Sequence, residues 1–250
     1  MSRFLSEPAE SANEPEYRSC VESITDNTNL MKTIVITGTS RGIGLATAHE
    51  FLARGYRVIG TSTSGVSPID HQMFIPVMLR LEDPASVGTC IDTIRETAPT
   101  IAGLINNAAV LLEDWDVPEI EMTQLQKTFE INVFGLIQLT EGLLEIIESR
   151  GGIINLSSGW GAITGKSVGI AAPHYKLSKA TINLYTRMLN ERLAAKRVSV
   201  SAIDPGWVRS DMGTRSAPKS PAAAAHDIAE LFDSDVPGGR FWSGGRERPW

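Results

Sequence analysis

The stretch from Thr33 to Gly55 constrains the fold of this chain most strongly. Residues 33–37 are short, apolar and β-branched, which is typical of a buried strand. Three glycines follow in the spacing Gly-x-x-x-Gly-x-Gly over residues 38–44, and a helical pattern runs from Ile43 to about Arg54. A strand, a glycine-rich turn and a helix in this order predict the first half of a βαβ unit.

The glycine-rich turn has the composition of a phosphate-binding site. Glycines allow a backbone to approach a pyrophosphate closely, and free N–H groups at a helix N-terminus attract anions. The alternative is a tight turn whose small residues serve packing alone. Our candidates for binding a dinucleotide in this turn are Gly38, Ser40, Arg41, Gly42, Ile43 and Gly44.

The end of the next predicted strand, Arg57–Thr61, bears on the choice of dinucleotide. NAD-binding units often place an acidic residue here for the adenosine ribose. This chain instead continues with Ser62, Thr63 and Ser64, which carry no charge to repel a 2′-phosphate, and Arg41 could supply a matching positive charge. These residues favour NADP(H), with NAD(H) as the alternative, and add Thr61 and Ser62 to the cofactor-binding candidates. A polar turn without a ligand is the other interpretation.

Strand and helix patterns continue to alternate along the chain. Further strands are predicted at 73–78, 103–109, 152–156, 198–203 and near 241–242. Helices are predicted at 84–98 with Asp83 as N-cap, from a Thr123-x-x-Gln126 capping box to about 151, from about 174 to 195, and from a Ser220-Pro221 start to about 232. This order predicts an α/β fold with a single Rossmann-like, doubly wound parallel β-sheet and helices on both faces.

Residues 1–30 differ from the remainder in composition. They contain six acids and two bases, so they carry −4 of the net charge of −6 and leave −2 on the other 220 residues. We predict a disordered acidic extension over 1–30 and one catalytic domain over 31–250. The balance of charge gives no footprint for nucleic acid or an anionic membrane, so neither is an expected partner.

Cysteine usage and hydropathy predict a cytoplasmic protein. Cys20 and Cys90 make no disulfide framework, which fits a reducing compartment. No run of about 18 apolar residues predicts a spanning helix, and the N-terminus lacks the features of a signal or transit peptide. The spacing of cysteines and histidines also offers no set of metal ligands.

Tyr175 and Lys179 are four residues apart, so a helix places their side chains on one face. The ordinary pKa of a phenol is near 10, and a neighbouring ammonium lowers it by favouring the phenolate. Such a pair can give a proton to a carbonyl oxygen or take one from an alcohol. The alternative is a solvated helix face, because Tyr-x-x-x-Lys is common by chance.

Five segments in order resemble the short-chain dehydrogenase/reductase family over nearly all of residues 32–250. They are Thr37-Gly38-x-x-x-Gly42-x-Gly44, Asn106-Asn107-Ala108-Ala109, Asn132, Ser158 with Tyr175-x-x-x-Lys179, and Pro205-Gly206-x-x-x-Ser210. Residues 33–63 look like carrier-protein reductases of this family. The segments 207–212 and 242–250 look more like its carbonyl-reductase members.

The resemblance implies roles for individual residues. Tyr175 would be the general acid or base, Lys179 would tune it and bind the nicotinamide ribose, Ser158 would polarise the substrate oxygen, and Asn132 would hold a water linking Lys179 to solvent. Ser157 is less favoured than Ser158 because strand alternation turns it away. The family positions for binding the cofactor are Asn106, Asn107, Ala108, Tyr175, Lys179, Pro205, Gly206, Val208 and Ser210.

Three departures from the family pattern matter. Ala109 replaces a glycine, and Arg80 replaces an Asp that commonly contacts adenine, so we do not transfer that role. The connection from Ser158 to Tyr175 is longer than usual, and we expect this loop to shape the substrate pocket. His174 stays outside the predicted catalytic set, because a lone histidine is more often structural.

The resulting prediction is an NADP-dependent oxidoreductase that reduces a small-molecule ketone or aldehyde to an alcohol. The alternatives are a non-catalytic dinucleotide sensor on the same fold and an NAD-dependent alcohol dehydrogenase that works oxidatively. A serine hydrolase is not supported, since no Gly-x-Ser-x-Gly elbow is present. The family commonly associates through the helices here containing Asn132 and Tyr175, so we expect a homodimer or homotetramer.

Overall fold

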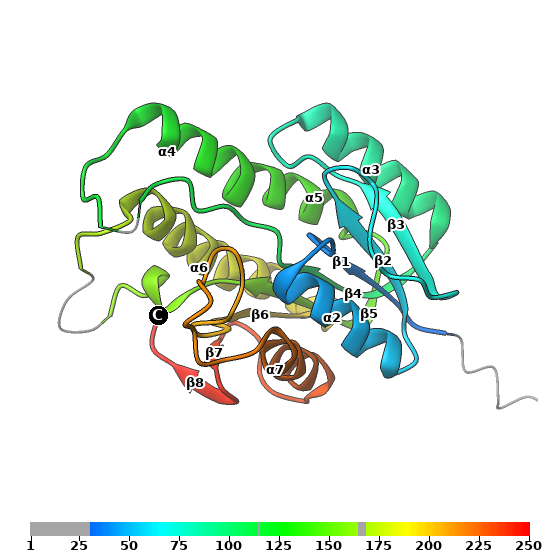
Figure 1. The fold of residues 1–250 in the computed structure, drawn as a ribbon. Helices are drawn as coiled ribbons and strands as arrows, with labels where there is room; N and C mark the ends of the chain where they lie inside the picture. The colour runs from blue at the N-terminus through cyan, green and yellow to red at the C-terminus, as the bar shows by residue number, and fades with distance from the viewer. Residues whose placement is uncertain (1–30, 115, 165–168) are drawn as a thin grey trace, which may run out of the picture. The chain divides into compact units, whose positions relative to one another are not determined.

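One mainly parallel sheet forms the centre of the fold (Figure 1), with strand order β3-β2-β1-β4-β5-β6-β7-β8 in the described part of the chain. Neighbouring strands are parallel except for β7 and β8, which form an antiparallel hairpin. The strands are β1 Thr33–Ile36, β2 Arg57–Ser62, β3 Phe74–Met78, β4 Ile101–Asn106, β5 Ile147–Leu156, β6 Ser199–Ile203, β7 Phe241–Ser243 and β8 Arg246–Arg248. The predicted α/β class is confirmed, whereas the sequence patterns did not predict the β8 strand.

This structure is a computed structural model that describes residues 31–114, 116–164 and 169–250. Contacts within the chain separate Lys32–Trp250 from the preceding residues. The predicted disordered extension over 1–30 lies outside the described residues. Within the described ranges, no helix combines the length and the hydropathy needed to span a membrane.

Helices cover both faces of the sheet, as Figure 1 shows. They are α2 Gly42–Ala53, α3 Pro84–Thr97, α4 Met122–Phe129, α5 Leu136–Leu143, α6 Pro173–Leu193 and α7 Pro221–Asp233. One apolar cluster packs α3, α5 and α6 against the sheet, and a second packs α2 and α7 against the opposite face. The doubly wound arrangement predicted from the alternating pattern is therefore present.

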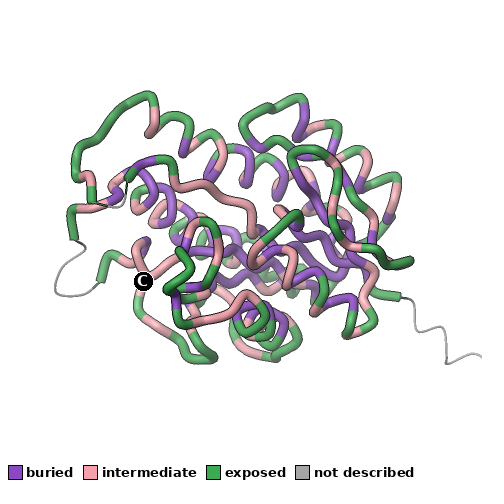
Figure 2. The backbone as a smooth tube through the Cα atoms, in the orientation of Figure 1, coloured by how far each residue is buried: buried purple, intermediate pink, exposed green. Residues whose placement is uncertain are grey.

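The side-chain alternation of β1 divides the core between these two clusters. Val35 belongs to the α3/α5/α6 side, while Ile34 and Ile36 belong to the α2/α7 side, and all three are fully buried. Burying an aliphatic side chain of this size contributes roughly 1.5–3 kcal/mol. Figure 2 shows that the central strands are buried, and every residue of β1 and β4 is in the buried class.

Two of the three predicted helix caps are confirmed. The Asp83 carboxylate accepts a hydrogen bond from the Ala85 N–H at 3.0 Å, and the Ser220 hydroxyl accepts one from the Ala223 N–H at 3.1 Å. The predicted capping box at Thr123 is wrong. The cap of α4 is Glu121, two residues earlier, whose carboxylate accepts from the free N–H groups of Thr123 and Gln124 in the first turn.

The predicted long helix over residues 123–151 is also wrong at its end. The segment contains α4, a π-helical turn at Glu130–Gly135 and α5, and it stops at Leu143. From Ile147 the chain pairs with β4 as part of β5, and a register shift there accompanies Arg150, whose φ is 66°. Pairing with the sheet overrides a local pattern that was compatible with helix.

The strand order places a crevice between β1 and β4. The chain runs outward from this point in opposite directions, toward β3 on one side and β7 on the other. Open α/β sheets bind ligands outside the carboxyl ends of the strands at such a switch point. The glycine-rich turn after β1 and residues 107–109 after β4 both lie at this edge.

Candidate active site

The glycine-rich turn after β1 packs against Asn107 after β4. The Asn107 amide donates hydrogen bonds to the carbonyl oxygens of Thr37 at 2.7 Å and Gly38 at 3.3 Å. Gly38 has a φ of +75°, and a Cβ on Gly44 would lie 2.1 Å from the Gly38 oxygen and 2.4 Å from the Asn107 amide nitrogen. Both positions therefore require glycine, one for its backbone conformation and the other for space.

The start of α2 is open to an anion. Its N-cap residue, Arg41, makes no side-chain cap, so no capping side chain competes for the free N–H groups of the first turn, whose residues line the crevice. The exposed Arg41 guanidinium forms an ion pair with Asp211 at 3.0 Å. An exposed pair of this kind contributes at most about 1 kcal/mol, so a bound anion can compete for Arg41.

The carboxyl end of β2 is tied to the same turn. Thr61 accepts from the Gly38 N–H through its hydroxyl at 3.4 Å and from the Thr39 N–H through its carbonyl at 2.8 Å. The Ser62 hydroxyl donates to the Val66 carbonyl. Arg80 is exposed at the end of β3 and does not line the crevice, which agrees with leaving it out of the predicted site.

A cavity of about 1420 Å³ occupies the crevice. Its lining includes seventeen of the candidate residues, namely Gly38, Ser40, Arg41, Gly42, Ile43, Gly44, Thr61, Ser62, Asn107, Ala108, Ser158, Tyr175, Lys179, Pro205, Gly206, Val208 and Ser210. The structure thus brings residues from six separate segments of the chain to one cavity.

Asn106 does not line this cavity. Its amide is buried below the cavity floor and donates to the Thr140 hydroxyl at 2.9 Å and the Asn155 oxygen at 2.8 Å. Its amide nitrogen joins β4 to β5 and α5, and its Oδ1 has no hydrogen-bond partner among the described residues. The cofactor contact expected of Asn106 stays a prediction.

Asn132 also lies outside the cavity lining, in the π-helical turn. Its side chain accepts from the Val110 N–H at 2.8 Å and donates to the Val110 carbonyl at 2.9 Å, and it donates to the Ser178 hydroxyl at 3.2 Å. The Ser178 hydroxyl in turn donates to the Tyr175 carbonyl. In this arrangement Asn132 holds the segment after β4, which forms one wall of the cavity, and the first turns of α6.

Tyr175 and Lys179 lie on successive turns of α6 and both face the cavity. The Lys179 Nζ is 5.5 Å from the centroid of the Tyr175 ring and donates to the Leu156 carbonyl at 2.7 Å. Burial lowers the pKa of Lys179 to about 8, because an ammonium without water around it is less stable. The helical pairing predicted from the four-residue spacing is thus present.

The pKa of Tyr175 is shifted in the opposite direction to the one expected. Burial raises this pKa above its ordinary value, and the negative charges of Asp204 and Glu113 raise it further, while a hydrogen bond with Ser158 acts against them. Lys179 is not among the groups that shift it. The protein by itself therefore keeps the Tyr175 phenol protonated.

Ser158 is the serine that lies beside the phenol. It lies two residues after the end of β5, its hydroxyl accepts from the Trp160 N–H at 3.1 Å, and it also bonds to Tyr175. Ser157 is the serine that strand alternation was expected to turn away from the site. It borders the cavity but is nearly fully buried, and within the described residues its hydroxyl has no hydrogen-bond partner.

Three features of the site were not predicted. Trp160 packs edge-on against Tyr175 with ring centroids 6.3 Å apart. Asp204 lines the cavity and forms an ion pair with Arg248 of the C-terminal hairpin. Glu113 accepts from the Tyr175 N–H at 2.8 Å. No local pattern identifies these residues, since each acts through a partner at least 15 positions away.

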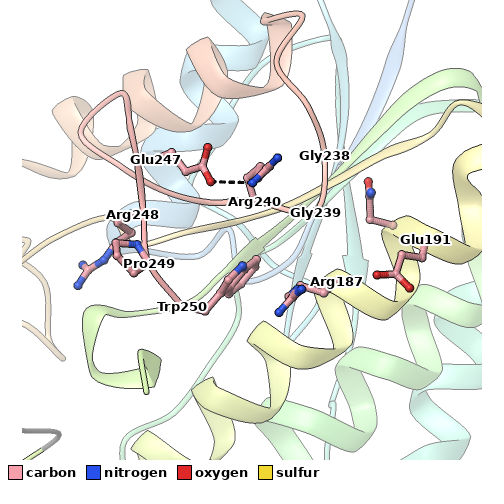
Figure 3. A pocket seen from close by; sticks show the side chains of 10 residues that line it. Arg187, Glu191, Gly238, Gly239, Arg240, Glu247, Arg248, Pro249 and Trp250 are labelled. Carbon is pink, nitrogen blue, oxygen red and sulfur yellow. Dashed lines mark hydrogen bonds and ion pairs between the residues drawn. The ribbon is translucent and has the colours of Figure 1, made fainter. Parts of the chain in front are cut away.

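A second cavity, of about 610 Å³, lies between α6 and the C-terminal hairpin. Figure 3 shows the ion pair between Arg240 and Glu247 at one side and Trp250 beside Arg187 at another. The Arg187 guanidinium is 5.9 Å from the centroid of the Trp250 ring. None of the candidate site residues lines this cavity.

Comparisons with known proteins agree with this geometry. A family model described as short chain dehydrogenase matches residues 32–221. The chain is 27% identical over 217 residues to the 3-oxoacyl-acyl-carrier-protein reductase FabG of Salmonella typhimurium, with 84% of each chain covered.

Solved structures match the fold over most of the chain. A putative short-chain dehydrogenase/reductase from Burkholderia multivorans with bound NADP has a TM-score of 0.79, with 24% identity and coverage of 88% of this chain and all of the other. NADPH-bound carbonyl reductase from chicken fatty liver has a TM-score of 0.77, with 22% identity and coverage of 88% and 94%.

Proposed function

The chain belongs to the short-chain dehydrogenase family of NAD(P)-dependent oxidoreductases, and we propose that it uses NADPH to reduce a small-molecule ketone or aldehyde. One observation carries the proposal. Tyr175, Lys179 and Ser158 meet at a single cavity whose far wall is the glycine-rich turn and the open start of α2. The acid and the anion site therefore face a common space.

The chemistry assigned to the residues follows from their protonation and position. When bound, the nicotinamide supplies the hydride that forms the new C–H bond. Ser158 binds the substrate oxygen, and Tyr175 gives its phenolic proton to that oxygen as negative charge develops there. A phenol whose pKa is raised by burial and by two carboxylates is in the acid form that reduction needs. Lys179 places a cation beside the phenolate that remains.

The preference for NADPH rests on the end of β2 and on Arg41. Thr61 and Ser62 are uncharged and line the cavity, so no carboxylate at this strand end repels a 2′-phosphate. Arg41 offers a guanidinium whose present partner is only an exposed carboxylate. The nucleotides bound in the Burkholderia and chicken structures support the same choice.

The direct test is NADPH oxidation over a panel of ketones and aldehydes. We expect turnover by the wild type, and a loss of roughly 100-fold or more in kcat for Tyr175→Phe, in the range that general acids contribute. Tyr185→Phe is the matched control, because Tyr185 lies on the same helix and bonds to Glu141, and it does not line the cavity. Equal rates for wild type and Tyr175→Phe would remove Tyr175 from the mechanism. Tight NADPH binding without turnover would favour the sensor alternative.

We also propose that the chain forms a homodimer or homotetramer through α6 and the π-helical turn. Leu177, Leu184 and Met188 repeat on α6 at spacings of seven and four residues and are about half exposed, and Phe134 is exposed as well. Exposed apolar residues in register along a helix are typical of an interface. Light scattering should give a mass of two or four chains, and a monomer would contradict the proposal.

A further inference from the structure

Glu113 and His174 form a buried acid–base pair against the backbone of Tyr175. Their side chains are 2% and 1% exposed, and the His174 Nδ1 is 3.5 Å from the Glu113 Oε2. The other carboxylate oxygen, Oε1, accepts from the Tyr175 N–H at 2.8 Å. Glu113 belongs to the segment after β4, so this contact joins two parts of the chain 62 positions apart.

The hydrogen bond to Nε2 fixes the tautomer of His174. Its Nε2 lies 2.9 Å from the Glu121 N–H and must accept that proton, so Nε2 carries no hydrogen of its own. The ring hydrogen is therefore on Nδ1, which faces the Glu113 carboxylate. The His174 Nδ1 and the Tyr175 N–H thus face the two oxygens of one buried side chain, and of these two contacts the one from Tyr175 is a hydrogen bond.

The Glu113 carboxylate caps the N-terminus of α6, where the N-cap residue provides no side-chain acceptor. The residue before α6 is Ala172, which has a left-handed φ of 50° and no side chain that could accept a hydrogen bond. Tyr175 is the third residue of the helix, whose N–H is normally satisfied by a cap. A negative charge at this place also interacts favourably with the helix dipole.

We propose that Glu113 is a positioning residue for the catalytic acid: supported by His174, its carboxylate caps the first turn of α6 and fixes the Tyr175 phenol relative to Ser158 and Lys179. The inference rests on the proposed reductase function. It adds a residue that does not line the cavity and that acts on the phenol through the backbone. The same contact fixes the cavity wall, since Val110 and Leu111 lie between Glu113 and β4.

Several charged groups lie around the Tyr175 side chain, and among them Asp204 and Glu113 raise its pKa. From α6 itself come Lys179 and Lys176, the latter stacked over Trp160. Asp204 at the end of β6 faces the phenol and is paired with Arg248. Glu113 approaches from the segment after β4, and its negative charge raises the pKa of Tyr175.

Three variants test the inference. Glu113→Gln keeps the size but removes the charge, and it puts an NH2 donor in place of one of the two oxygens that face the Tyr175 N–H and the His174 Nδ1. Glu113→Asp keeps the charge but is too short to reach both donors. Glu119→Gln, an exposed acid in the same segment, is the control. For each variant, kcat, KM and the pH profile of reduction are measured with NADPH and the best carbonyl from the panel.

We expect Glu113→Gln to lower kcat by roughly 10- to 100-fold, the range that a misplacement of about 1 Å produces, while the Kd for NADPH stays within about twofold of the wild type. Because the Glu113 charge raises the pKa of Tyr175, Glu113→Gln should also shift the decrease of kcat at alkaline pH to a lower pH. Glu113→Asp should lower kcat but leave the pH of that decrease unchanged. Glu119→Gln should change neither kcat nor its pH profile. Unchanged kcat and pH profile in Glu113→Gln would overturn the inference.

Hydrogen exchange separates this inference from the proposed function. In Glu113→Gln the amides of residues 174–176 should exchange faster than in wild type and in Glu119→Gln, whether or not a substrate is found. Absence of turnover in wild type would refute the reductase proposal, whereas unchanged exchange at these amides would refute the cap. If Glu113→Gln does not fold, Glu113→Asp gives both readouts.

Discussion

Replacing Asn132 by alanine tests how the cavity wall is held. The Asn132 side chain makes two hydrogen bonds to the backbone of Val110, at 2.8 and 2.9 Å, and a third to Ser178 at 3.2 Å. Asn132 is buried, and Val110 lines the cavity. The substitution therefore removes the partners of one backbone donor and one backbone acceptor at the same time.

The size of the effect follows from these contacts. A buried polar group left without its partner costs about 1–3 kcal/mol. Val110 is only partly buried, so water can satisfy part of the loss, and we expect the free energy of unfolding to fall by about 2–3 kcal/mol. That is a substantial share of the roughly 5–15 kcal/mol typical of a whole domain.

Urea unfolding measures this change, and kinetics show whether the wall matters to the reaction. Glu130→Ala is the matched control, because Glu130 begins the same π-helical turn but is exposed, and we expect a change within about 0.5 kcal/mol. For Asn132→Ala we also expect KM for the carbonyl to rise, since Val110 loses its anchor. If Asn132→Ala lost no more stability than the control and left KM unchanged, the hydrogen bonds from Asn132 to Val110 would not be what holds the cavity wall.

Two further predictions concern Lys179 and the glycine-rich turn. The pKa of Lys179 is about 8 in the folded chain and 10.5 without burial, so the unfolded chain binds more protons between these two pH values. The free energy of unfolding should therefore rise with pH across that window by about 3 kcal/mol relative to Lys179→Met. Urea unfolding at several pH values measures this, and the same pH dependence of stability in wild type and Lys179→Met would contradict it. Gly44→Ala pushes a Cβ into Gly38 and Asn107 and should weaken NADPH binding at least about tenfold, measured by cofactor fluorescence. Gly88→Ala, within α3 and facing open space, should instead stabilise the fold by about 0.5–1 kcal/mol.

The sequence was sufficient to predict the structure where the deciding interactions lie within one short segment. The strand, glycines and helix of residues 33–54 fold as predicted, because the turn needs a left-handed Gly38 and an uncrowded Gly44. The caps at Asp83 and Ser220 follow from the affinity of their side chains for free N–H groups. The placement of Tyr175 and Lys179 on one face followed from their four-residue spacing, because it requires only that the segment be a helix.

Predictions failed where a distant partner decides the outcome. The apolar residues up to Ile147 fit a helix, yet pairing with Ile101 of β4 turns that segment into β5. The cofactor contact expected of Asn106 stays a prediction, although distant partners, Thr140 and Asn155, engage its amide nitrogen.

The role of Glu113 could not be found in the sequence for the same reason, because its partners His174 and Tyr175 are brought to it only by the packing of α6. The sign of the pKa shift at Tyr175 also depends on burial and on Asp204, and neither follows from the Tyr-Lys spacing. The cytoplasmic localisation stays a prediction.

Transfer of a labelled hydride tests the central claim most directly. The chain is incubated with NADPH that carries deuterium at the transferable position of nicotinamide C4 and with a carbonyl from the panel, and the product alcohol is examined by mass spectrometry. We predict one deuterium on the former carbonyl carbon with the wild type, and product reduced by roughly 100-fold or more with Tyr175→Phe, although the variant still binds NADPH. Alcohol without the label, or equal labelled product from Tyr175→Phe, would contradict the account.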